Sequence, residues 1–266
     1  MTIKIDSLTS RIYSDYFLPN RLDIYRSVLE FALAHGYEIV SVENYYDLKQ
    51  SNQLLANKII ICRHDIDTDP STVKIFFKIE QELGARASYY FRLSTLSPEL
   101  MAAIDEYGSE ASYHYEEIAS YCKTHGIKNR ESVWGAMPEI QAQFIDNYLS
   151  IKTKLSLKMR TVCSHGDFVN RLLNIANTEL LTADIRSKCG IQCETYDQII
   201  RKDSFNISDC HAPIFWKDES PFIAITRGEQ IINLLTHPRH WRVSWQSNTK
   251  DNFQRVIEGL NYHYLS

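Results

Sequence analysis

Residues 59–70 read IIICRHDIDTDP, and this stretch decides the fold class because an apolar run leads directly into acids and a helix start. Residues 59–62 are typical of a buried strand. Asp69 and Pro70 suit the N-cap and first turn of a following helix, and Gly84 suits its end. The stretch therefore predicts a strand, a loop that carries acids, and a helix.

The same alternation recurs along the chain. Further strands are expected at 87–93, 110–115, around 162–163 and at 231–236, and helices at 22–33, 96–107, 117–125, 137–157 and 252–264. Short strands that alternate with helices of about ten to fifteen residues predict βαβ units and a parallel sheet. An α/β fold is therefore expected, and both a β/α barrel and an open doubly wound sheet agree with the pattern.

The composition is that of a globular chain. Of its 266 residues, 44% are hydrophobic and 23% are charged. Roughly 250 residues is the usual size of a β/α barrel, and no linker-like change of composition divides the sequence. We expect a single domain over residues 1–266, with an N-terminal helical extension over about residues 1–50.

Several classes of partner are disfavoured. The net charge of −4 argues against nucleic acid or an anionic membrane surface. Neither of the two common Gly-rich phosphate-binding motifs occurs. No apolar stretch approaches the roughly 18 residues of a membrane span, and the first residues lack the apolar centre of a secretory signal. We expect a cytoplasmic protein that acts on a small molecule or a glycan, and the oligomeric state stays open.

Residues capable of acid–base or metal chemistry follow four of the apolar runs. They are His64, Asp65 and Asp67 in the first, His114 in the second, His165 in the third and His237 in the last. A single His after a strand is more often a framework residue than a ligand. Because functional residues of parallel α/β folds lie beyond the carboxyl ends of the strands, the joint occurrence favours a site.

The residue types point to a divalent metal. Asp65 and Asp67 are two residues apart, so in an extended chain both carboxylates lie on one side. Two carboxylates that share a site repel each other, and a bound cation would relieve this. Together with His114, they supply the nitrogen and oxygen ligands that zinc and other first-row divalent metals accept. A solvated acidic loop is the alternative.

Three more residues are candidates for binding or orienting a substrate. Arg92 and Arg160 could orient carboxylates at a barrel mouth, although buried structural arginines are as common. Asp209 could accept a hydrogen bond from a sugar hydroxyl or from another site residue.

Three segments together resemble motifs of the polysaccharide deacetylase family, whose members fold as a distorted β/α barrel. They are RHDIDTDP (63–70), ASYHYEE (111–117) and LLTHPRHW (234–241), and TVCSHGD (161–167) and NISDCH (206–211) resemble the intervening segments of a divergent branch. The resemblance covers about residues 58–242. It implies that Asp65 is the catalytic base, Asp67 and His114 are metal ligands, and His237 is the general acid.

The sequence departs from the family pattern at one metal ligand. The second motif usually has another His four residues after the first, and this chain has Ile118 there. His165 or Glu116 could supply the missing ligand, and loss of the metal site is the third possibility.

The resemblance implies a metal-dependent hydrolase, with zinc as the first candidate metal, that removes an N-acyl group such as acetyl from an amino sugar or glycan. Asp67, His114 and His165 are the expected ligands. Another C–N hydrolase, such as a deformylase or a cyclic-amide hydrolase, would use the same residues on a different small amide. A glycan-binding barrel without catalysis is the alternative outside the enzymes.

Overall fold

A computed structural model describes residues 7–51 and 58–265. Its strands form one sheet in which every pair is parallel. The strands are β1 (Tyr37–Val40), β2 (Lys58–Ile66), β3 (Ser88–Phe91), β4 (Glu110–Tyr115), β5 (Thr161–Ser164), β6 (Cys193–Glu194), β7 (Phe205–Ser208) and β8 (Ile231–Thr236). The order β6-β5-β4-β3-β2-β8-β7, with β1 beside β2, forms a curled half-barrel, which confirms the expected distorted β/α barrel.

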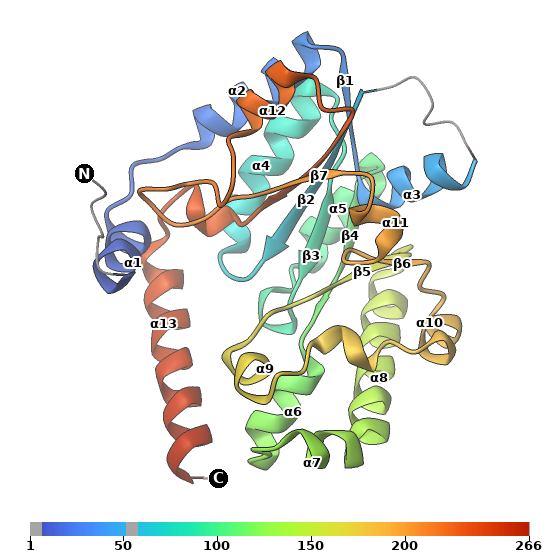
Figure 1. Ribbon diagram of the computed structural model, residues 1–266, viewed down its shortest axis with the longest axis vertical. Helices are drawn as coiled ribbons and strands as arrows, with labels where there is room; N and C mark the ends of the chain where they lie inside the picture. The colour runs from blue at the N-terminus through green and yellow to red at the C-terminus, as the bar shows by residue number, and fades with distance from the viewer. Residues whose placement is uncertain (1–6, 52–57, 266) are drawn as a thin grey trace.

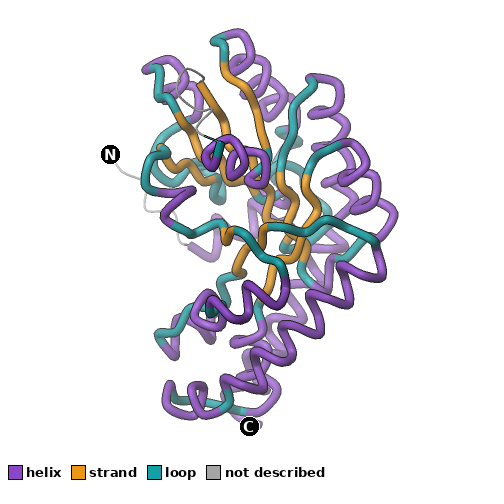
Figure 2. Tube along the Cα trace, turned by 90° about the vertical axis from the view of Figure 1, so that its right-hand side faces the viewer, coloured by secondary structure: helices purple, strands orange, loops and turns teal. Residues whose placement is uncertain are grey.

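Most of the helices lie along the outer side of the sheet (Figure 2), whereas two short ones, at 42–50 and 198–201, contribute to the core on the inner side. The helices are α1 (Ser7–Tyr16), α2 (Leu22–Ala34), α3 (Val42–Gln50), α4 (Pro70–Leu83), α5 (Pro98–Tyr107), α6 (Glu117–His125), α7 (Arg130–Gly135), α8 (Met137–Leu155), α9 (Phe168–Leu173), α10 (Ala183–Cys189), α11 (Gln198–Arg201), α12 (Pro221–Arg227) and α13 (Trp245–Leu260). Short helical turns are η1 (Leu93–Thr95), η2 (Asn177–Leu180) and η3 (Pro238–His240), and a π-helical segment, η4 (Asn261–Leu265), follows α13.

Residues 7–50 are not only a helical extension. They also contain β1, which the sequence pattern did not reveal and which pairs in register with the first half of β2. β3 pairs with the second half of β2, and β8 runs along its other edge. The nine-residue β2 is therefore an interior strand, and its carboxyl end has neighbours on both sides.

Side-chain alternation along β2 separates two cores. Ile60, Cys62 and Ile66 belong to the large core between sheet and helices. Ile59 and Ile61 belong to a second core, inside the curl, which includes Cys163 of β5. Because side chains of a strand alternate between its faces, Arg63 and Asp65 also point inside the curl.

Asp69 begins α4 differently from the expected N-cap. Its backbone is left-handed, with φ of 53°, and its carboxylate accepts hydrogen bonds from the Ser71 and Thr72 hydroxyls instead of a helix N–H. Asp tolerates this conformation because its short side chain bonds locally. Gly84 ends the helix with φ of 69°, as expected.

Candidate metal centre

Three strand ends bring Asp67, His114 and His165 together. Asp67 follows β2, His114 lies in β4 opposite Cys163 of β5, and His165 directly follows β5. The His165 backbone N–H donates to the Tyr115 carbonyl at 2.8 Å, which continues the pairing of β4 with β5 by one residue. Three strands, β2, β4 and β5, thus deliver the three side chains to one edge of the sheet.

The three ligand atoms have the spacing of a metal site. His165 Nδ1 lies 3.0 Å from Asp67 Oδ1 and 3.2 Å from His114 Nε2, and His114 Nε2 lies 3.4 Å from Asp67 Oδ1. Bonds of about 2.0–2.2 Å in a tetrahedral zinc site place neighbouring ligand atoms roughly 3.3–3.6 Å apart. The observed triangle is therefore close to one face of such a tetrahedron.

The surrounding hydrogen bonds suit a metal better than a network without one. His114 Nδ1 lies 3.0 Å from the Cys163 carbonyl oxygen, so Nδ1–H donates and the Nε2 lone pair faces Asp67 and His165. Asp67 Oδ1 is buried and has no hydrogen-bond partner among the described residues. A buried carboxylate oxygen without a partner is unfavourable in a protein interior, and a cation would satisfy it.

The charges around the three atoms favour a cation. Burial alone would raise the pKa of Asp67, but His165 and His114 hold it well below its usual range. Burial alone would lower the pKa of His114, but its acidic neighbours, Asp65 and Asp67 among them, raise it well above its usual range. The site therefore stabilises positive charge at His114, and a divalent ion would take the place of that proton.

Asp65 lies beside the three ligand atoms, inside the curl. One of its oxygens is 3.8 Å from His114 Nε2 and 3.5 Å from the Arg63 guanidinium. The Cys163 thiol donates to the Asp65 carboxylate at 3.5 Å. Burial raises the pKa of Cys163, so the sulfur stays a neutral donor. Arg63 and Cys163 thus fix the carboxylate from two sides.

His237 is held by Asp209. Its Nδ1 lies 2.6 Å from Asp209 Oδ1, and its backbone N–H donates to Oδ2 at 2.7 Å. The Trp241 indole N–H also donates to Oδ2, at 2.8 Å. Burial alone would lower the pKa of His237, but Asp209 raises it, with further contributions from Asp67 and Asp65. Asp209 therefore engages Nδ1 of the ring, and Nε2 is the other ring nitrogen.

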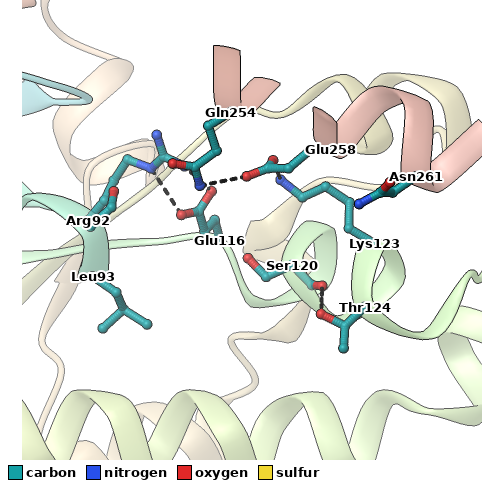
Figure 3. A pocket seen from close by; sticks show the side chains of 10 residues that line it. Arg92, Leu93, Glu116, Ser120, Lys123, Thr124, Gln254, Glu258 and Asn261 are labelled. Carbon is teal, nitrogen blue, oxygen red and sulfur yellow. Dashed lines mark hydrogen bonds and ion pairs between the residues drawn. The ribbon is translucent and has the colours of Figure 1, made fainter. Parts of the chain in front are cut away.

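Arg92 and Glu116 form an ion pair at the edge of the site (Figure 3). Arg92 Nε and a terminal nitrogen donate to the two Glu116 oxygens at 3.0 and 2.8 Å. A second terminal nitrogen of Arg92 reaches the backbone carbonyl of Asp67 at 3.4 Å. Glu116 is therefore engaged by Arg92 and is not part of the group formed by Asp67, His114 and His165.

Arg160 is not brought to the site. It directly precedes β5, so it lies at the amino end of a strand whose carboxyl end carries His165. Its guanidinium pairs with Asp47 and Glu43 of α3. The prediction that Arg160 orients groups at the barrel mouth disagrees with this position, because parallel strands send their amino ends to the opposite edge.

Ile118 explains the departure from the expected ligand pattern. It is the second residue of α6, is fully buried and belongs to the large hydrophobic core. A side chain at that position packs against the helix layer, and His165 lies beside His114 instead.

Sequence reasoning missed the environment of His64. Its side chain points to the helix side, where Nε2 lies 2.7 Å from Glu80 of α4 and Nδ1 lies 2.6 Å from the Thr236 hydroxyl. The alternation along β2 contains the signal, because His64 is one residue out of phase with Asp65. It also missed the contact of Cys163 with Asp65, which Cys163 faces from another strand.

Two cavities under α13 border the group formed by Asp67, His114 and His165. His165 lines a cavity of about 260 Å³, and Asp67 lines another of about 170 Å³. Asp251 and Gln254 of α13 line both. In Figure 1, β2 points toward the side of the molecule where α6, α9 and α13 lie. The arrangement leaves space beside Asp67 and His165 for a water molecule and a substrate.

Comparison with known proteins does not identify a family. No family model matches the chain, and no curated protein matches it significantly. Within the described residues, no helix has both the length and the apolar character that crossing a membrane requires.

Proposed function

We propose that this protein is a metal-dependent hydrolase that removes an N-acyl group, such as acetyl, from an amino sugar or glycan. The observation that carries the proposal is the triangle of Asp67 Oδ1, His114 Nε2 and His165 Nδ1, with sides of 3.0 to 3.4 Å. Asp65 lies beside this triangle, and His237 is near enough to lower the pKa of Asp67, so the two could act as base and acid. Zinc is the metal we propose first, because two imidazoles and a carboxylate with an open position are typical of catalytic zinc.

Each side chain has a distinct part in the proposed reaction. A metal held by Asp67, His114 and His165 would polarise the amide carbonyl and lower the pKa of a bound water toward about 7. Asp65, fixed by Arg63 and Cys163, accepts the proton of the attacking water.

The leaving group explains the need for His237. An amine anion is a very poor leaving group, so C–N cleavage requires that the nitrogen be protonated as the bond breaks. His237 carries that proton on Nε2, because Nδ1 is bonded to Asp209. Asp209 is therefore a positioning residue that also favours the protonated imidazole. Arg92 has a similar supporting part, through its contact with the backbone of Asp67.

Metal content and turnover together test the proposal. We expect purified protein to hold about one zinc per chain, and the Asp67→Ala and His114→Ala variants to lose it. Asp65→Asn should keep the metal and lose release of acetate from N-acetylated sugars, because it removes only the base. Asp146→Asn, an exposed acid on α8, is the matched control and should keep both.

Three results would contradict the proposal. A protein that stays metal-free after loading with zinc would lack the proposed centre. Loss of metal in Asp65→Asn would mean that Asp65 is a metal ligand and Asp67 the base. Zinc-loaded protein that releases no acid from N-acetyl or N-formyl sugars would not be an amino-sugar hydrolase.

A further inference from the structure

A second cavity lies inside the curl, in the opening between the two ends of the sheet. It has a volume of about 190 Å³ and is bounded by residues that follow β6, by β7 and β8, and by Arg63 of β2. This is less than the roughly 300–1,000 Å³ of sites for drug-sized ligands, so it fits a substituent or a small part of a ligand. It is separate from the cavities lined by His165 and Asp67.

The charge of this cavity is positive. Arg63 is buried at its inner end, and Arg201 and Lys217 are exposed. In the described ranges neither Arg201 nor Lys217 makes an ion pair, and Asp218 is the acid of the lining. Two cations without acidic partners beside a buried guanidinium attract an anion.

Buried polar atoms without partners give a second, independent indication of a ligand. Arg63 Nε, Thr195 Oγ1 and Asn233 Oδ1 are all buried and make no hydrogen bond among the described residues. All three residues line this cavity. Buried polar groups are nearly always paired, so unpaired donors and an acceptor around one cavity indicate that a polar ligand completes them.

The cavity lies one layer below the proposed catalytic residues. Arg63 lies two residues before Asp65, and Leu235 lies two residues before His237, the two proposed catalytic residues. Residues two apart in a strand have side chains on the same face. Two residues of a parallel strand span roughly 7 Å. A group in the cavity would therefore lie about one sugar ring away from the reacting amide.

We infer that this cavity binds an anionic group, a carboxylate or a phosphate, that belongs to the amino-sugar substrate. The assignment to the substrate rests on the proposed function, whereas anion binding itself does not. Arg63 supplies the buried charge and an N–H donor. Thr195 and Asn233 bind neighbouring hydroxyls, and Arg201 and Lys217 attract the anion at the entrance.

Calorimetric titration with simple sugars tests the inference without turnover. The probes are glucuronate, glucose 6-phosphate and glucose, which differ in charge at one position. We expect at least one anionic probe to bind ~10-fold or more tightly than glucose, and more weakly as salt increases. The tighter anionic probe identifies carboxylate or phosphate as the natural group.

Variants locate the binding. Arg201→Gln combined with Lys217→Gln should weaken the anionic probe at least ~5-fold and leave glucose unaffected. Lys74→Gln combined with Lys154→Gln removes the same charge from exposed positions on α4 and α8 and should change neither. Asp67→Ala, which removes a proposed metal ligand, should keep anion binding.

Three outcomes would overturn the inference. Equal affinity for charged and neutral sugars would remove the anion preference. An unchanged affinity in the Arg201 and Lys217 double variant would place the anion elsewhere. Loss of binding in Asp67→Ala alone would place it on the metal. If the protein binds no metal and shows no turnover but binds the probes as expected, the anion site is supported and only the proposed function is refuted.

Discussion

Replacement of His165 with alanine tests whether His165 supplies the metal ligand that the family pattern places four residues after the first His of the second motif. His165 Nδ1 lies within 3.2 Å of both other proposed ligand atoms, so His165→Ala removes one of three protein ligands. Structural zinc sites with four ligands bind with apparent free energies of about 10–16 kcal/mol, or roughly 2.5–4 kcal/mol per ligand. The zinc affinity should therefore fall by about 10² to 10³-fold.

Competition with a chromophoric zinc chelator at pH 7 measures this change directly. His125→Ala is the matched control, because His125 is exposed near the end of α6. The control should bind zinc as the wild-type protein does, and circular dichroism should show both variants folded. An unchanged affinity in folded His165→Ala would refute the assignment of His165 as a ligand.

Three further perturbations test other parts of the account. Ile118→His should not raise the zinc content. It should lower the free energy of unfolding in urea by about 1–3 kcal/mol, because it places an imidazole in an apolar core. A gain of zinc would show that this position reaches the metal. Asp209→Asn should lower the pKa of His237 in an NMR titration, because it removes the charge that raises this pKa. An unchanged pKa would mean that Asp209 has no such effect. Burial lowers the pKa of His64, but Glu80 and its neighbours raise it to about 10, above the unfolded value of about 6.5. The resulting stabilisation is fully present below pH about 6.5 and is lost as pH rises toward about 10, so Glu80→Gln should flatten the fall in unfolding free energy between pH 7 and 9 by up to ~1.4 kcal/mol per pH unit. Parallel slopes for wild type and variant would contradict that coupling.

Much of the fold was predictable because its main signals are local. The strands expected at 110–115 and 231–236 have those bounds. β1, β6 and β7 were missed. They have two to four residues, and their pairing with neighbours, not their sequence pattern, makes them strands.

The candidate site was predictable where it depends on position along a strand. The spacing of Asp65 and Asp67 places both carboxylates on one side of β2, and the two lie within reach of His114. Contacts between distant segments were not predictable. The partner of Glu116 is Arg92, from the preceding strand's end, and only the three-dimensional arrangement shows that this pair leaves His165 beside His114.

Arg160 shows the opposite limit. An arginine is suited to orienting a carboxylate. Arg160, however, directly precedes β5 and so lies at the amino edge of the sheet, where it forms ion pairs with α3. Direction along the strand was the deciding information, and it was present in the sequence.

Anomalous diffraction from zinc-loaded crystals tests the central claim most directly. Four groups in the described residues could hold a metal: Asp67–His114–His165, Asp65–His114–Cys163, Cys62–His64–Glu80 and Asp209–His237–His240. The account expects one strong peak about 2.0–2.2 Å from Asp67 Oδ1, His114 Nε2 and His165 Nδ1. A peak at one of the other groups, or no peak in crystals that contain zinc in their solution, would contradict it.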